Sequence, residues 1–208
     1  ASSFSTYFGH HFSTIEGGFV CTNDTDFYNV IKSIRSHGWS RDLDVSTQIK
    51  LKSKHSIDDF RNLYTFYYPG FNLRSTDLQA FIGLGQIEKL NDICFARNKN
   101  YKLYDRLIKN SFWKIDDSNF EFVSNFAYPI IHPERDKIVN DLMDNKIECR
   151  PLIAGNMGKQ PFFYERYGMK NYPFADVIHD YGLYVPNHQK LKSDEIEFVC
   201  SIINKHTR

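Results

Sequence analysis

The sequence lacks the features that indicate a membrane protein, a secreted protein or a nucleic-acid-binding protein. No apolar run approaches the roughly 20 residues of a membrane span, and residues 1–20 do not show the charged and then apolar stretches of a signal peptide. Neither sign of charge dominates, because 26 Lys and Arg stand against 25 Asp and Glu. The net charge of +1 gives no electrostatic footprint for nucleic acid or for an anionic membrane. We therefore expect a cytoplasmic protein that binds neither.

The chain has four cysteines, but no two of them form a Cys-x-x-Cys pair. This spacing argues against a structural zinc site and predicts reduced, partly buried thiols. A starting Met is also missing, and residues 3–7 already read as a strand. We expect the sequence to begin inside a domain whose earlier part is absent.

What the sequence does contain is sufficient for a sizeable core. It has 208 residues, of which 41% are hydrophobic, so it can form one large domain or two modest ones. Strand and helix patterns that follow one another along the chain predict the α/β class. Residues 1–108 read as the rear part of a larger α/β domain, and residues 109–208 read as a small α+β domain.

The N-terminal part of the chain predicts a hairpin and then a helix. Residues 3–7 and 19–24 are apolar or β-branched stretches on either side of a Glu-Gly-Gly turn, so they are expected to pair as strands. Apolar residues at helical spacing follow Asp24 or Thr25, either of which can cap the helix. The pattern stops at Gly38.

Residues 39–70 show a weaker pattern and predict a long loop with one or two helical turns. A long periodic segment follows. Thr76 and Gln79 match a capping box, in which each side chain satisfies a backbone N–H of the first turn, so a helix should begin there. Because about 35 residues is long for one globular helix, a break is expected near Asn91 and Asp92.

Strand and helix patterns also alternate in the last part of the chain. Pro133 suits the first turn of a helix, and Ser193 suits the cap of a closing helix. The expected elements are a strand at 120–132, a helix at 133–146, a strand at 147–153 and a helix at 193–205.

Polar and small residues crowd the stretch between the two N-terminal strands, where His10 and His11 are adjacent. In an extended segment successive side chains face opposite sides, so only one of the two is expected to enter a given pocket. Adjacent histidines that point apart also argue against a metal site, and none is predicted. Taken alone, the pair is compatible with ordinary surface or second-layer histidines.

Three separated motifs resemble those of the DegT/DnrJ-type sugar aminotransferases, a family of fold type I pyridoxal phosphate enzymes. The run STYFGHH at residues 5–11, followed by IEGG at 15–18, is similar to the segment of the family's Schiff-base lysine, with His10 in the lysine position. Residues 70–90 resemble the family's Gly-x-Asn-x-Arg motif at the start of a helix, and residues 149–161 resemble a late active-site segment of one subgroup. The resemblance implies the C-terminal half of a fold type I PLP-dependent transferase.

That subgroup comprises the nucleotide-sugar 3-dehydratases, in which a His-His pair replaces the lysine and the cofactor works as pyridoxamine phosphate. The resemblance implies an enzyme of deoxysugar and lipopolysaccharide O-antigen biosynthesis that acts on a nucleotide-linked 4-keto-6-deoxyhexose. It also implies pyridoxal 5'-phosphate or pyridoxamine 5'-phosphate as cofactor, a homodimer with a shared active site and, in one variant of the pathway, a reductase partner. An imidazole does not form an imine as a lysine amine does, but near pH 7 it accepts and returns protons.

The resemblance implies roles for individual residues, each of which also has a purely structural interpretation. His10 is the expected general acid and base. Ser5 is expected to contact the cofactor phosphate, and Asn72 the phosphate in a neighbouring subunit's site. The expected cofactor-binding residues are Ser5, Asn72, Gly17 and Gly18. The expected substrate-binding residues are Arg74, Arg150, Asn156, Gln160 and His188.

Two other functions remain open. A nucleotide-sugar aminotransferase is favoured by the general family motifs, although no lysine lies within 21 residues of His10. A lysine-free, non-catalytic relative is favoured by the missing earlier part. The groups that hold the pyridine ring are expected before the start of this chain, so the 208 residues alone are not expected to bind the cofactor.

Overall fold

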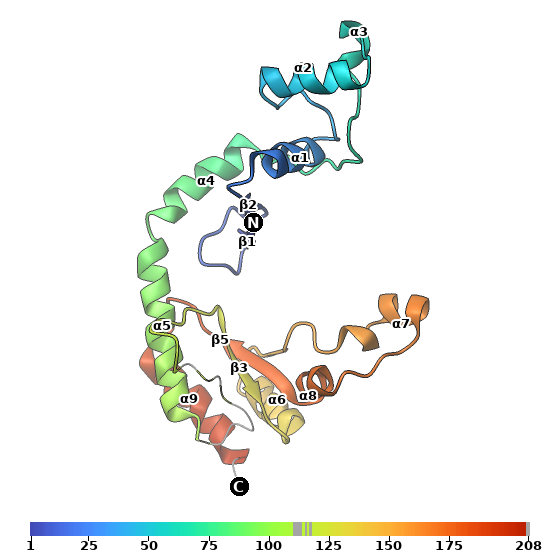
Figure 1. The fold of residues 1–208 in the computed structure, drawn as a ribbon. Helices are drawn as coiled ribbons and strands as arrows, with labels where there is room; N and C mark the ends of the chain where they lie inside the picture. The colour runs from blue at the N-terminus through green and yellow to red at the C-terminus, as the bar shows by residue number, and fades with distance from the viewer. Residues whose placement is uncertain (110–113, 115, 117, 207–208) are drawn as a thin grey trace. The chain divides into compact units, whose positions relative to one another are not determined.

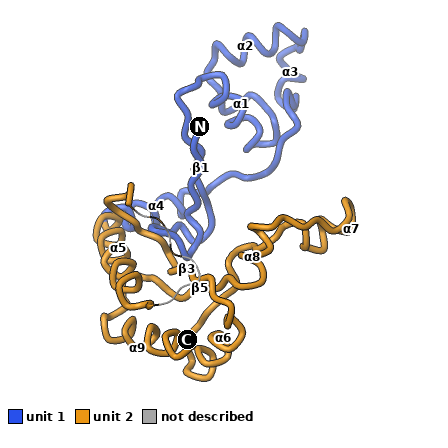
Figure 2. Tube along the Cα trace, turned by 60° about the horizontal axis from the view of Figure 1, so that its bottom comes forward, with its two compact units in different colours: residues 1–88 blue, residues 89–208 orange. Residues whose placement is uncertain are grey.

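The structure, a computed structural model, describes residues 1–109, 114, 116 and 118–206. Helices and small sheets form a mixed α/β structure (Figure 1), which confirms the predicted fold class. The chain divides into two compact units, Ala1–Glu88 and Lys89–Arg208, which Figure 2 shows in different colours.

The division between the units follows Glu88, whereas the sequence predicted a domain boundary after Ile108. The helix α5 (Leu90–Leu107) accounts for the difference, because it packs against α9 (Ser193–Ile203) within the second unit. That the chain contains parts of a large and a small domain of a longer protein stays a prediction.

The first unit begins with the predicted hairpin, in which β1 (Ser2–Ser5) pairs antiparallel with β2 (Gly18–Cys21). Both strands are shorter than expected because side-chain hydroxyls end them in turns. The Ser5 hydroxyl accepts a hydrogen bond from the Tyr7 N–H at 3.2 Å, and the Thr22 hydroxyl accepts one from the Asp24 N–H at 3.1 Å.

The predicted first helix is present as α1 (Thr25–Arg35). Asp24 is its N-cap, because the Asp24 carboxylate accepts a hydrogen bond from the Phe27 N–H at 2.9 Å. The helix ends at Arg35 rather than continuing to Gly38. The reason is that the Ser36 backbone leaves the helix to pair with Asn72 in an isolated antiparallel bridge.

The segment predicted as a long loop contains more helix than expected. The main helix has a clear cap, since the Asp44 carboxylate accepts a hydrogen bond from the Thr47 N–H at 2.9 Å. All of its side chains are half-buried or exposed, so hydrophobic periodicity did not reveal it. The helices of this segment are α2 (Val45–Lys54) and α3 (Asp59–Asn62).

α4 (Asp77–Ile87) begins with the predicted capping box. The Thr76 hydroxyl accepts from the Gln79 N–H at 3.4 Å, and the Gln79 Oε1 accepts from the Thr76 N–H at 2.8 Å. The break before α5 falls just before Leu90 and not at Asn91. α5 begins without a side-chain cap, so Asn91 does not serve as one.

The second unit is built around a three-stranded antiparallel sheet in the order β3-β5-β4. The strands are β3 (Ala127–Ile131), β4 (Arg150–Pro151) and β5 (Gly182–Pro186). The helices after α5 are α6 (Arg135–Asp144), α7 (Pro161–Tyr167), α8 (Pro173–Tyr181) and α9. Tyr128, Ile130, Leu183 and Val185 share one face of the sheet and are buried in the core against α5, α6 and α9. α8 also contacts β3 and β5.

Several sequence-based boundaries in this unit are wrong. The helix predicted from Pro133 begins at Arg135, because the Glu134 N–H donates to His132 Nδ1 at 3.0 Å in a turn before it. The strand predicted at 147–153 is reduced to two residues, Arg150–Pro151. α7, α8 and β5 were not predicted.

Ser193 is the first residue of α9 and not its cap, as the sequence had predicted. Lys192 occupies the cap position, and its backbone N–H donates to the Glu195 carboxylate at 2.8 Å. Among the helices that the structure describes, none combines the length and the apolar character needed to cross a membrane.

Leu142 and Met143 provide a matched test of the core, because they are neighbours on α6. Leu142 is fully buried, whereas Met143 is 64% exposed. Leu142→Ala should lower the free energy of unfolding by about 2–5 kcal/mol, through lost burial and the cavity that remains. Met143→Ala should change it by less than about 0.5 kcal/mol. Urea denaturation followed by circular dichroism measures both, and equal losses would contradict the assigned core.

Candidate functional site

The two histidines lie on the loop between β1 and β2, and this loop is not extended. The His10 N–H donates to the Tyr7 carbonyl at 3.0 Å, which closes a turn. The argument that His10 and His11 face opposite sides of a strand is therefore wrong for this segment. Both side chains are half-buried. The His10 ring lies edge-on to the Tyr7 ring, with centroids 6.4 Å apart.

Two buried threonines close the base of this loop, which we call the histidine loop (residues 7–13). Thr6 and Thr14 are 1% and 6% exposed, and their hydroxyl oxygens are 2.6 Å apart. The Thr14 hydroxyl donates to the Glu16 carbonyl at 2.9 Å, so the Thr6 hydroxyl donates to Thr14. Backbone hydrogen bonds from the Thr6 N–H to the Gly17 carbonyl and from the Thr14 N–H to the Thr6 carbonyl complete the closure.

Gly17 and Gly18 have a structural reason to be glycines. Gly17 has a φ of +148°, and a Cβ there would lie 2.7 Å from the Thr14 hydroxyl oxygen and 2.8 Å from that of Thr6. A Cβ on Gly18 would lie 2.7 Å from the Phe4 carbonyl oxygen across the hairpin. Any larger residue would separate the strands or the threonine pair. The predicted role of these glycines at a cofactor stays a prediction.

The other predicted site residues of the first unit are exposed. Ser5 ends β1, and its hydroxyl keeps a proton to donate while it accepts from Tyr7. Asn72 lies in the extended segment whose backbone bridges Ser36. Arg74 precedes the Thr76 cap of α4. Their roles toward cofactor and substrate stay predictions.

In the second unit, β4 places Arg150 opposite Tyr184 of β5. The exposed guanidinium donates through Nε to the Glu148 carboxylate at 2.8 Å, and this interaction raises the pKa of Arg150. Gln160 is half-buried, and its Nε2 donates to the Ala154 carbonyl at 3.1 Å. These contacts leave the predicted roles of Arg150 and Gln160 in substrate binding untested.

His188 is exposed just after β5, and its Nδ1 accepts from the Lys190 N–H at 3.2 Å. The Asn100 side chain of α5 holds the His188 carbonyl at 3.0 Å. A contact of His188 with substrate stays a prediction. Among the described residues, no group of three or more His, Cys, Asp or Glu side chains is arranged to hold a metal ion.

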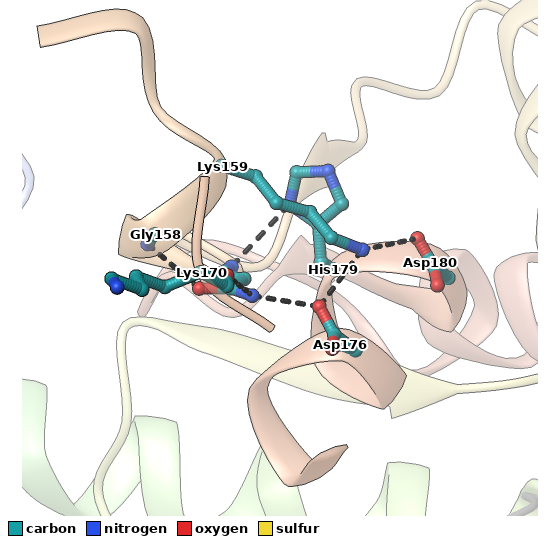
Figure 3. A network of polar contacts seen from close by, with 7 residues as sticks. Gly158, Lys159, Lys170, Asp176, His179 and Asp180 are labelled. Atoms are coloured by element: carbon teal, nitrogen blue, oxygen red, sulfur yellow. Dashed lines mark hydrogen bonds and ion pairs between the residues drawn. The ribbon is translucent and has the colours of Figure 1, made fainter. Parts of the chain in front are cut away.

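Asn156 is fully buried, and both ends of its side-chain amide are engaged with groups shown in Figure 3. Its Nδ2 donates to the Asp176 carboxylate at 2.7 Å and to the Lys170 carbonyl at 3.1 Å. Its Oδ1 accepts from the Gly158 N–H at 2.7 Å. The Asn156 backbone N–H donates to His179 Nδ1 at 3.4 Å. The predicted substrate contact of Asn156 stays a prediction, and these contacts hold its loop (residues 154–160) against α8.

The Lys159 side chain also contacts Asp176, which accepts the hydrogen bond of Asn156. The Lys159 ammonium points toward two carboxylates of α8 in Figure 3, at 2.8 Å from Asp176 and 3.8 Å from Asp180. Lys159 is the main reason that the pKa of Asp176 is lowered, and the Asn156 amide lowers it further. Asp176 in turn raises the pKa of Lys159.

The contacts that close these two loops were not predicted from the sequence. Thr6, Lys159 and Asp176 drew no functional prediction, although each holds a loop that carries predicted site residues. The Thr6–Thr14 hydroxyl pair spans 8 residues, and the contact between Asn156 and Asp176 spans 20. Such separations leave no periodic signal.

Comparison with known proteins agrees with the sequence motifs. The model of the DegT/DnrJ/EryC1/StrS aminotransferase family matches residues 1–204. The chain belongs to this family. The match includes the histidine loop, the start of α4 and the loop around Asn156, which are the segments that carried the resemblance.

The relatives include dehydratases and transaminases. The chain is 32% identical to the GDP-4-keto-6-deoxy-D-mannose 3-dehydratase of Yersinia pseudotuberculosis, over 98% of this chain and 53% of that protein. It is 26% identical to the UDP-4-amino-4,6-dideoxy-N-acetyl-beta-L-altrosamine transaminase of Helicobacter pylori, over 99% of this chain and 52% of that protein. The structure of E. coli GDP-4-keto-6-deoxy-D-mannose-3-dehydratase with bound hydrated PLP matches with a TM-score of 0.79 and 28% identity, over 97% of this chain and 53% of that chain. The chain spans about half the length of the curated relatives it matches.

The ion pair of the second loop offers a test by pH. Because the folded-state pKa of Asp176 is lowered, its contribution to stability is fully present above about pH 4 and is lost as the pH falls through the folded-state value. Lys159→Met removes the largest cause of the shift. The pKa of Asp176 should then rise toward its ordinary value, as measured by carboxyl-carbon NMR titration.

Asp180→Asn is the matched control for this titration. Asp180 is farther from the Lys159 ammonium than Asp176, at 3.8 Å against 2.8 Å. Its replacement should leave the pKa of Asp176 lowered. An Asp176 pKa that does not move in Lys159→Met would contradict the role assigned to Lys159.

Proposed function

We propose that the full-length protein is a pyridoxamine phosphate-dependent 3-dehydratase of a nucleotide-linked 4-keto-6-deoxyhexose. The observation that carries the proposal is His10, held on a closed loop in a chain that has no lysine before Lys32. The name of the Yersinia relative, a GDP-4-keto-6-deoxy-D-mannose 3-dehydratase, supports the same reaction and favours a GDP-linked sugar.

The residues near His10 fit a non-covalently held pyridoxamine phosphate. Ser5 has an exposed hydroxyl that can donate to a phosphate, and Gly17 and Gly18 are also exposed. An imidazole forms no imine, so it suits a cofactor that is not tethered. When bound, the cofactor supplies an amine for the sugar ketone and a ring that accepts electrons.

In this proposal His10 moves protons. A ring nitrogen of His10 would accept the proton lost by the carbon that bears the cofactor's amine, and the imidazolium would give a proton to the C3 hydroxyl oxygen, which leaves as water. The turn from Tyr7 to His10 and the threonine pair at the loop base keep the imidazole in place. The chain itself therefore supplies the acid and base of the elimination.

We assign the sugar nucleotide to Arg74, Arg150, Gln160 and His188. Arg150 is the most suitable of them for a diphosphate, because its guanidinium is exposed and has donors beyond the two that contact Glu148. Asn156 differs from the others, since it is completely buried and its amide is engaged. We propose that Asn156 supports the loop that presents Gln160.

Further properties belong to the same proposal. Asn72 is exposed in the first unit, which suits a contact with a cofactor phosphate in a neighbouring subunit, so we propose a homodimer with shared sites. We also propose a cytoplasmic location, in keeping with soluble nucleotide-sugar substrates. A reductase partner would be needed only where the product of elimination is reduced rather than hydrolysed.

An aminotransferase is the second candidate, and the family description and the Helicobacter transaminase favour it. It requires an amine near the cofactor, whereas His10 stands in the lysine position. A non-catalytic relative is the third candidate. All three are separated by incubating the full-length protein with pyridoxal phosphate, glutamate and GDP-4-keto-6-deoxymannose. Ammonia and a 3-deoxy sugar indicate a dehydratase, a stable 4-amino sugar indicates an aminotransferase, and an unchanged cofactor absorbance indicates no catalysis.

His10→Asn should lower kcat by roughly 10²- to 10⁴-fold, the contribution typical of a positioned acid or base. Asparagine is similar in size, so the loop should remain folded. His11→Asn is the control on the adjacent residue and should have a much smaller effect. Release of ammonia measures both rates. Equal effects of the two variants, or a cofactor that borohydride links covalently to the wild-type chain, would refute the role of His10.

A further inference from the structure

The base of the histidine loop contacts α4 at two points that the proposed reaction does not use. Gln79 Nε2 donates to the Glu16 carbonyl at 2.8 Å, across 63 residues of chain. A Cβ added to Gly83 would lie 3.1 Å from the Thr14 methyl carbon, so the missing side chain lets Thr14 approach the helix. Gln79 and Gly83 are one helical turn apart and share a face of α4. α4 therefore supports the loop base with a hydrogen bond, and Gly83 leaves room beside it for the Thr14 methyl group.

Thr14 connects α4 to both ends of the loop. Its hydroxyl has one proton, which goes to the Glu16 carbonyl at 2.9 Å, so it accepts the proton of the Thr6 hydroxyl at 2.6 Å. The Glu16 carbonyl consequently accepts hydrogen bonds from Thr14 and from Gln79. Two oxygen atoms thus make the connection: the Thr14 hydroxyl joins the entrance of the loop to its exit, and the Glu16 carbonyl joins the exit to the first turn of α4.

We propose that Thr14 and Gln79 are positioning residues for His10, and this inference rests on the function proposed above. A lysine bonded to a cofactor is held by a covalent bond, whereas an imidazole base is held by non-covalent contacts, among them those that fix its loop. Displacement of a reacting group by about 1 Å can cost about a hundredfold in rate. The contacts of Thr14 and Gln79 fix the loop base and thereby the position of the His10 ring during proton transfer.

Gln79→Glu separates the two tasks of this side chain. A glutamate keeps the capping box, because its carboxylate still accepts from the Thr76 N–H, but it has no N–H to donate to Glu16. In the full-length, cofactor-loaded enzyme, kcat should fall by roughly tenfold, the effect of about one hydrogen bond, with a smaller change in KM. Gln86→Glu places the same charge on the same helix and should leave both parameters unchanged.

Thr14 offers a second, independent pair of variants. Thr14→Val keeps the shape of the side chain and removes the hydroxyl, so kcat should fall as in Gln79→Glu. Thr14→Ser restores the hydroxyl and should recover most of the lost rate. A serine variant that is as slow as the valine variant would contradict the proposal, because the hydroxyl would then not be the group that matters.

Amide hydrogen exchange at His10 in the cofactor-free protein reports on the loop without turnover, since this N–H donates to the Tyr7 carbonyl. Exchange should become about tenfold faster in Gln79→Glu and unchanged in Gln86→Glu. Unchanged exchange in Gln79→Glu, or faster exchange with an unchanged kcat, would overturn the proposal. A wild-type enzyme without 3-dehydratase turnover would instead refute the proposed function, and exchange alone would then decide whether Thr14 and Gln79 hold the loop.

Discussion

Buried polar side chains that require hydrogen-bond partners constrain the two loops that carry His10, Asn156 and Gln160. In the first unit the Thr6 and Thr14 hydroxyls are buried and bond to each other, and in the second unit Asn156 is buried with its amide engaged at both ends. A buried donor or acceptor that loses its partner costs about 1–3 kcal/mol. A change in the conformation of either loop would therefore break hydrogen bonds of buried groups and lower the stability of the protein. The buried side chains, and not the exposed ones, set the conformation of each loop.

This constraint has a particular consequence where a base replaces a covalent anchor. A lysine that bonds to its cofactor finds the reacting atoms through that bond, even on a mobile segment. An imidazole has no such bond, so its position depends on the backbone that carries it and on the contacts of its ring. The histidine loop has the properties that this role demands, namely a turn at His10, a closed base at Thr14 and a brace from α4 through Gln79. Under the proposed function, a histidine in the lysine position and a loop closed by hydrogen bonds serve the same chemistry.

Local patterns in the sequence predicted the elements that depend on local spacing. The hairpin, a helix capped at Asp24 or Thr25 and the Thr76 capping box all follow from residues within a few positions of one another, and the structure confirms them with Asp24 as the cap. α2 was missed because its half-buried and exposed side chains carry no apolar period. The resemblance supplied candidate site residues but not their contacts. The brace from Gln79 reaches across 63 residues, and no spacing rule indicates such a contact.

The contacts that hold the second loop differ in how strongly they restrain it. The Lys159 and Asp176 side chains are 24% and 22% exposed, so water and salt screen part of their attraction. Asn156 is completely buried, so movement of its side chain would break three hydrogen bonds of its amide inside the protein. The neutral amide is therefore the more persistent restraint. Lys159 supports it in acid, because Lys159 lowers the pKa of Asp176 and so extends to lower pH the range in which the amide donates to a charged acceptor.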